Sequence, residues 1–187
     1  MGRRLKKLTR RLIRERRLAR KNYDRQRLLN RLAQPGPHPG IVILDHLKPQ
    51  FNVGKIFRSA DAFGMREVHL IGVDYFDPGP AMGSFKWVPA HYHRNFDSCY
   101  QVLRRQGYRL FATEPAAGEI LGGCRLPEKS AFVFGNEGAG LSFDPGRYDD
   151  IQMVRIPQFG KVQSLNVSVA ASLVMYEYVR QHHLPGA

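Results

Sequence analysis

Short, nearly unbroken apolar runs recur along the chain from residue 41 onward, and apolar residues at helical spacing lie between them. A continuous apolar run of about four to eight residues is typical of a strand that is buried on both faces. Strands that alternate with helices predict an α/β fold with a mainly parallel sheet and helices on both faces. We expect strands at 41–44, 68–73, 109–112, 131–134 and 152–156, and helices at 53–63, 95–106 and 166–182.

The N-terminal segment has a different pattern, in which scattered leucines stand among arginines and lysines. Residues 3–33 contain neither Pro nor Gly, so helix is the natural local structure, although its apolar stripe is thin. The run Pro35–Gly40 then breaks any helix and indicates a linker. We therefore expect a basic helical arm over residues 1–36 and a folded domain over residues 41–183.

Charge is distributed very unevenly between these two parts. The net charge is +13, and residues 1–31 hold 14 Lys and Arg against only Glu15 and Asp24. The remaining 156 residues are nearly neutral, with 15 basic and 14 acidic side chains. A neutral domain with a cationic arm suits a polyanion, and RNA, DNA and an anionic membrane are all compatible with charge alone. A solvated, partly disordered tail is the alternative for the arm.

No apolar run is long enough for a membrane span or a signal-peptide core, and the arm lacks the broad apolar face of a membrane-surface helix. We therefore expect a cytoplasmic protein with no membrane partner. Cys99 and Cys124 are too few for a disulfide framework and have no Cys or His close by in the sequence, which predicts buried, reduced thiols. His91 and His93 lack the spacing of a metal site, so we expect no metal.

Three segments place Asn, Arg, Glu and Ser beside glycines at strand-to-helix junctions, where α/β proteins build their sites. They read NVGKIFRSADAFG at 52–64, FGNEGAGLS at 134–142 and IPQFGKVQSLNVSVAA at 156–171. Taken alone, Asn52 could merely cap a helix and Arg58 could merely pair with a nearby aspartate. The glycines lack dinucleotide-binding spacing and no Walker lysine follows them, which disfavours nucleoside-triphosphate chemistry.

In order and internal spacing, the three segments resemble the motifs of the SpoU (TrmH-like) family of RNA methyltransferases in the SPOUT superfamily. The resemblance covers about residues 41–180. It implies a C-terminal trefoil knot, a homodimer, and S-adenosylmethionine as methyl donor, without a metal. The implied reaction is methyl transfer to a ribose 2′-hydroxyl of tRNA or rRNA. A non-catalytic RNA-binding or ribosome-assembly protein on the same fold is the alternative, and a DNA-binding protein is disfavoured because no groove-reading motif is present.

The resemblance also implies individual site residues. The implied catalytic set is Asn52, Arg58, Glu137, Ser164 and Asn166. The implied donor-binding set is Gly135, Ile156, Leu165 and Thr113. From charge rather than resemblance, we expect RNA contacts from Arg10, Arg11, Arg14, Arg17 and Lys21, with Tyr23 stacking on a base.

Arg58 carries a charge that the methyl-transfer reaction could use. Members of the family are proposed to use this arginine as the base that activates the hydroxyl. A guanidinium keeps its proton up to a pKa above about 12, so we expect Arg58 instead to fix the substrate phosphate and to stabilise developing alkoxide charge. Glu137 and Asn52 are expected to orient it.

Overall fold

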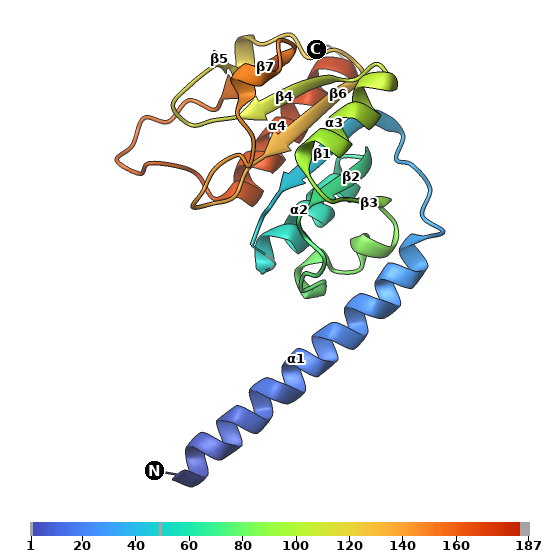
Figure 1. Ribbon diagram of the computed structural model, residues 1–187, viewed down its shortest axis with the longest axis vertical. Coiled ribbons are helices and arrows are strands. Elements are labelled where there is room, and N and C mark those ends of the chain that lie inside the picture. Colours follow the sequence, from blue (N-terminus) through green and yellow to red (C-terminus); the bar gives the residue numbers. More distant parts are fainter. Residues whose placement is uncertain (1, 49, 184–187) are drawn as a thin grey trace.

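The structure is a computed structural model that describes residues 2–48 and 50–183, with side chains described from residue 13 to residue 182 (Figure 1). Within this part of the chain, seven parallel strands form one sheet in the order β3-β2-β1-β6-β4-β7-β5. The predicted α/β fold with a mainly parallel sheet is thus confirmed. The strands are β1 (His38–Asp45), β2 (Met65–Ile71), β3 (Ala90–His93), β4 (Arg109–Thr113), β5 (Glu119–Ile120), β6 (Ser130–Phe134) and β7 (Ile151–Arg155).

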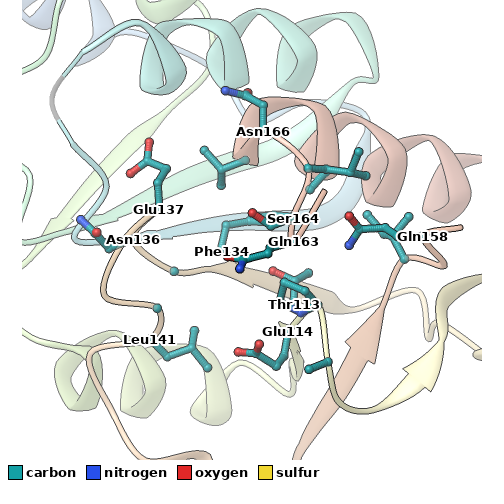
Figure 2. Close-up of a pocket in the computed structure, with 18 of the residues that line it drawn as sticks. Thr113, Glu114, Phe134, Asn136, Glu137, Leu141, Gln158, Gln163, Ser164 and Asn166 are labelled. Atoms are coloured by element: carbon teal, nitrogen blue, oxygen red, sulfur yellow. The ribbon is translucent and has the colours of Figure 1, made fainter. Parts of the chain in front are cut away.

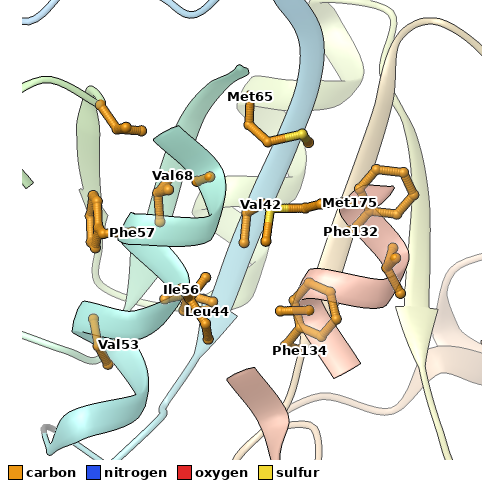
Figure 3. Close-up of a cluster of buried hydrophobic side chains, with 14 of the residues drawn as sticks. Val42, Leu44, Val53, Ile56, Phe57, Met65, Val68, Phe132, Phe134 and Met175 are labelled. Carbon is orange, nitrogen blue, oxygen red and sulfur yellow. The ribbon is translucent and has the colours of Figure 1, made fainter. Parts of the chain in front are cut away.

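Helices cover both faces of the sheet. They are α1 (Gly2–Asn30), α2 (Phe51–Ala62), α3 (Phe96–Arg105) and α4 (Val167–His183). Val42 and Leu44 of β1 point into a core shared with α2 and α4, as Figure 3 shows, whereas Ile41 and Ile43 point into a second core beneath α3. Because β1 is buried on both sides, its sequence is a continuous apolar run instead of an alternating one.

The sequence missed β3 and β5, and both are short. β5 has two residues and lies at one edge of the sheet, while β3 reads Ala-His-Tyr-His and forms the other edge. Neither contains an apolar run, so the pattern that predicted the inner strands is absent. The expected linker at 35–40 is also shorter than predicted, because β1 already begins at His38.

The helix that the sequence assigned to the arm is anchored in the core at its C-terminal end. Tyr23 is completely buried, and its ring packs against Phe76 and Phe85. Asn30 donates to the carbonyl oxygens of Phe85 (2.6 Å) and Val88 (2.7 Å). The expectation that Tyr23 stacks on a base is therefore wrong. The preceding turns of α1 project away from the sheet (Figure 1), and no helix among the described residues combines the length and apolar character needed to cross a bilayer.

Candidate active site

A cleft of about 680 Å³ opens at the carboxyl ends of three adjacent strands, β6, β4 and β7 (Figure 2). Its walls come from the end of β4 and the loop after it (113–116), from the end of β6 and the loop after it (134–138, 140 and 141), and from β7 onward (154, 156, 158, 163–167 and 170). Since neighbouring parallel strands end at the same edge of a sheet, segments far apart in sequence converge there. The cleft thus gathers the second and third sequence motifs.

The four residues expected to hold the methyl donor, namely Thr113, Gly135, Ile156 and Leu165, all line this cleft. Gly135 lies in a tight loop, where Asn136 and Gly140 exchange backbone hydrogen bonds of 2.8 and 2.9 Å. A Cβ atom at position 135 would lie 2.6 Å from the carbonyl carbon of Gly140. Only glycine therefore lets the loop close in this way.

Four of the five expected catalytic residues gather at the cleft. Glu137, Ser164 and Asn166 line it, as Figure 2 shows. Asn52, on the first turn of α2, donates through Nδ2 to Glu137 Oε1 (2.7 Å) and accepts at Oδ1 from Asn166 Nδ2 (3.2 Å). One hydrogen-bonded chain, Glu137–Asn52–Asn166, therefore joins all three motifs. Asn166 also caps α4, because its Oδ1 accepts from the Ser168 amide at 3.0 Å.

Arg58 lies apart from this group. Its side chain is exposed on α2 and does not line the cleft. Among the described residues we find no hydrogen bond or ion pair that involves its guanidinium, so Glu137 and Asn52 do not orient it within one chain. The exposed guanidinium of Arg58, within the first motif, is accessible to an anionic ligand.

Asp45 is a residue of the site that the sequence analysis did not select. It ends β1, is completely buried, and accepts hydrogen bonds from the Ser142 amide (2.6 Å) and the Ser142 hydroxyl (2.7 Å). These bonds fasten the far end of the second motif to the sheet. The signal was present in the sequence, since a lone carboxylate at the end of an apolar strand needs a nearby donor.

Other residues of the cleft were not among the site residues that the sequence predicted. Glu114, Gln158 and Gln163 line it. Gln158 Oε1 is buried and has no hydrogen-bond partner among the described residues. A buried acceptor without a partner is costly, and a bound ligand that donates to it would remove the cost.

The expected RNA-binding residues all lie on α1. The side chains of Arg14, Arg17 and Lys21 are exposed. Arg10 and Arg11 belong to the same helix, and their side chains lie outside the described part.

The sequence model of the SpoU rRNA Methylase family matches residues 39–176. The chain belongs to the SpoU family. The SpoU match contains every segment that lines the cleft and all five expected catalytic residues. The predicted resemblance to the SpoU family is thereby confirmed.

Similar SpoU proteins include enzymes named for two kinds of RNA. The chain is 33% identical over 162 residues to the 23S rRNA (guanosine-2′-O-)-methyltransferase RlmB of Neisseria meningitidis, covering 84% of this chain and 63% of that protein. It is 33% identical over 147 residues to the tRNA (guanosine(18)-2′-O)-methyltransferase of Thermus thermophilus, and this match covers 75% of this chain and 74% of that protein. The chain therefore spans less than two thirds of the Neisseria relative's length.

Solved structures of similar proteins agree with the fold. The AdoMet-bound rRNA methyltransferase of Sinorhizobium meliloti has a TM-score of 0.71 at 28% identity, covering 83% of this chain and 61% of that one. The TrmH/SpoU tRNA modifying enzyme of A. aeolicus has a TM-score of 0.70 at 27% identity, covering 84% and 82%. The likeness thus extends over most of the described domain.

Proposed function

We propose that this chain is an S-adenosylmethionine-dependent RNA methyltransferase that methylates a ribose 2′-hydroxyl of tRNA or rRNA, in the cytoplasm. The observation that carries the proposal is the hydrogen-bonded chain Glu137–Asn52–Asn166 at the edge of a ligand-sized cleft. The named activities of the Neisseria and Thermus relatives, both guanosine 2′-O-methyltransferases, support it. Because one relative acts on 23S rRNA and the other on tRNA, either RNA class fits.

The cleft suits the methyl donor in size and in chemistry. Its volume of about 680 Å³ falls within the range of about 300–1,000 Å³ typical of small-molecule sites. Leu141 and Val154 give apolar walls, and Gln158 Oε1 offers an acceptor without a partner among the described residues. Thr113, Gly135, Ile156 and Leu165 would hold the donor. When bound, S-adenosylmethionine supplies an electrophilic methyl group on its sulfonium.

The chain's own residues would then position the RNA and manage charge. Asn52 holds Glu137 and Asn166 in place, which fixes the turn that carries Ser164. Alignment of reacting groups alone can lower a barrier by several kcal/mol. Arg58 would bind the phosphate next to the target ribose through its forked guanidinium and stabilise the negative charge that develops on the oxygen. The hydroxyl proton would pass to the RNA phosphate or to solvent.

We also propose that the segment after β6 forms a trefoil knot. β4 lies between β6 and β7 in the sheet, and the loops that follow β6 and β7 both line the same cleft. In a trefoil knot the C-terminal segment passes through a loop of the preceding chain, and here the segment after β7 would pass through the loop that follows β6. Knots are very rare, so this part of the proposal rests on the SpoU membership as well.

A homodimer fits the exposed surface of α4. Val169, Leu173 and Tyr176 are 48%, 41% and 49% exposed, and their spacing of four and three residues places them on one side of the helix. Phe159, 98% exposed in the third motif, adds a further apolar ring to the surface. Apolar residues that gather on an outer face mark an interaction site, and a second copy is the commonest partner for such a face.

The experiment that tests the function uses the purified chain, radiolabelled S-adenosylmethionine, and separate pools of total tRNA and rRNA. Labelled RNA is digested to nucleosides and separated. A 2′-O-methylnucleoside from one pool supports the proposal and identifies the RNA class. Donor binding without transfer to either pool would instead favour the non-catalytic RNA-binding protein. A Glu137→Gln variant, which keeps the side chain's shape and removes its charge, is the control and should lose most of the transfer.

A further inference from the structure

A second cluster of reactive side chains lies at the edge of the sheet opposite to β5, well away from the cleft. β2 and β3 pair in parallel, with His69 opposite His91 and Ile71 opposite His93. Partners in a parallel pair point to the same face, and α3 brings Cys99 onto that face. The spacing of His91 and His93 along the sequence predicted no metal here, whereas the strand pairing brings distant ligands together.

The donor atoms of three of these residues converge. His69 Nδ1 lies 2.8 Å from His93 Nε2, and Cys99 Sγ lies 3.5 Å from the same His69 nitrogen. All three donor atoms lie within 4.8 Å of one another. His69 and Cys99 are buried, while His93 is half-buried and gives the group contact with solvent. The other ring nitrogen of His69 lies 3.0 Å from Glu67 Oε1.

The cluster contains more hydrogen-bond donors than its acceptors can satisfy. When His69 donates through Nε2 to Glu67, its Nδ1 holds a single lone pair. That lone pair faces two donors, the His93 N–H and the Cys99 S–H, and it can accept well from only one. A cation in the same place would bind the nitrogen and the sulfur atoms together and leave the Glu67 bond intact. A carboxylate that accepts from the outer nitrogen of a ligating histidine is a recurrent arrangement at zinc sites.

We propose that His69 Nδ1, His93 Nε2 and Cys99 Sγ form a site for Zn²⁺, with Glu67 orienting His69. Thiolate and imidazole are the ligands that zinc prefers, and three protein ligands leave a fourth position for water. The His69–His93 nitrogen separation would open from 2.8 Å to about 3.3 Å, the spacing of two nitrogen ligands at tetrahedral angles. As zinc binds, the thiol proton of Cys99 is released to solvent, and the His93 proton moves from Nε2 to Nδ1 so that Nε2 can bind the ion. The ion would join β3 and α3 to β2.

Protonation of the ligands agrees with this assignment. Burial, together with the charges of His69 and His91, lowers the pKa of His93 to about 4, so its imidazole is neutral near pH 7 and keeps a lone pair. Burial also lowers the pKa of His69, although Glu67 opposes the shift. Burial raises the pKa of the Cys99 thiol to about 12, so metal binding must displace its proton, as zinc does at other thiol sites.

An alternative set of Glu67, His69 and His91 shares the same central histidine. It lacks a thiolate, His91 is half exposed, and the Glu67 carboxylate is already paired with both His69 and His91. Zinc at a buried site gains more from the softer thiolate. The set that contains Cys99 is therefore favoured, and the two sets predict different spectra.

The test uses the full chain after metal removal with a chelator, titrated with Co²⁺ as a spectroscopic substitute for Zn²⁺. A thiolate ligand gives an intense charge-transfer absorption that nitrogen and oxygen ligands do not give. We expect one equivalent of Co²⁺ with this band in the original chain, displaced by Zn²⁺, and the loss of the band in Cys99→Ser. The matched controls Cys124→Ser and His91→Gln should keep the band. Glu67→Gln should weaken the affinity about 10- to 100-fold.

Two further readings make the result independent of how well Cys99→Ser folds. His93→Gln changes a half-buried ligand and should weaken Co²⁺ binding at least about a hundredfold, while saturating Zn²⁺ should raise the melting temperature of the original chain by about 5 °C. The proposal is overturned if the original chain shows no stoichiometric binding, if His93→Gln binds as tightly as the original chain, or if the band is lost in Cys124→Ser. If Co²⁺ binds without a thiolate band, and this binding is lost in His91→Gln, the ion belongs to the alternative set. None of these readings depends on methyl transfer.

Discussion

Asn52 links the second and third motifs in the proposed site, because the nitrogen and the oxygen of its side-chain amide each make a hydrogen bond. Nδ2 donates to Glu137 and Oδ1 accepts from Asn166. A carboxylate at position 52 could still accept from Asn166 but could not donate to Glu137. The site therefore distinguishes asparagine from aspartate, two residues of nearly equal size.

We predict that Asn52→Asp lowers methyl transfer at least about tenfold, because it places two carboxylates side by side and breaks one bond of the chain. The melting temperature should change little, since Glu137 is exposed. Steady-state transfer and thermal denaturation measure the two effects. The matched control is Asn95→Asp, which caps α3 outside the site and should be neutral because Asp caps as well as Asn. Equal activity of both variants would contradict the linking role of Asn52.

Replacement of Arg58 tests whether its forked guanidinium is needed. Arg58→Lys keeps the charge but removes bidentate binding to phosphate, so we expect lower RNA affinity and a turnover at least about tenfold slower. Single-turnover transfer and RNA titration separate the two. Arg105→Lys, an exposed position on α3, is the control. Near-normal turnover and RNA affinity in Arg58→Lys would show that the bidentate role is wrong.

Among the elements, α1 shows best where reading the sequence succeeded and where it failed. The composition of residues 3–33 predicted a helix, and α1 is one. Tyr23, Gln26 and Asn30 form its buried side, at spacings of three and four residues. Two of these three are polar, so no apolar stripe marked the packing face. Asn30 is satisfied there by backbone atoms of residues 85–90, a match that only the folded chain displays.

Two truncations should therefore behave differently. Deletion of residues 1–19 spares the anchoring residues of α1 and should leave the melting temperature nearly unchanged, while deletion of residues 1–35 also removes Tyr23 and Asn30 from the core. Loss of one large buried aromatic side chain alone costs about 3–5 kcal/mol. Both truncations should weaken RNA binding and reduce its salt dependence, while donor binding should persist in the shorter deletion. Unchanged RNA affinity after deletion of residues 1–19 would contradict the role of the arm.

On the scale of the whole molecule, the sequence predicted features made by neighbouring residues but not contacts between residues far apart along the chain. The long inner strands and the helices followed from local patterns, and the resemblance supplied residues for the cleft. The contacts between motifs did not follow, because Asn52 and Asn166 are separated by 114 positions. Nor did the grouping of His69 with His93, which requires the register of an edge strand that the pattern missed. The sequence therefore predicted elements and single site residues, whereas the contacts between distant segments became visible only in the folded structure.

Assembly into a homodimer through α4 can be tested with Leu173→Glu. A charge in the centre of the exposed apolar row should oppose burial of that face, and we expect the variant to be monomeric by sedimentation and to lose transfer. Its thermal stability as a monomer should be close to that of the parent fold, because Leu173 is already 41% exposed. Val102→Glu, at a 39% exposed site on α3, is the control and should remain a dimer. A monomeric parent chain would contradict the proposal directly.

The anchoring of α1 has a consequence for how the arm can search for RNA. Hydrogen bonds of Tyr23 and Asn30 fix the C-terminal end of α1 to the core. The projecting turns therefore have a fixed rotation about the helix axis relative to the domain. Residues 2–18 would reach roughly 25 Å at a rise of about 1.5 Å per residue. One residue inserted between these projecting turns and their anchor would turn every cationic side chain by about 100° while conserving their number. If RNA binding requires the cationic side chains to point in one direction, the insertion should weaken RNA affinity. If binding depends on charge alone, RNA affinity should stay the same.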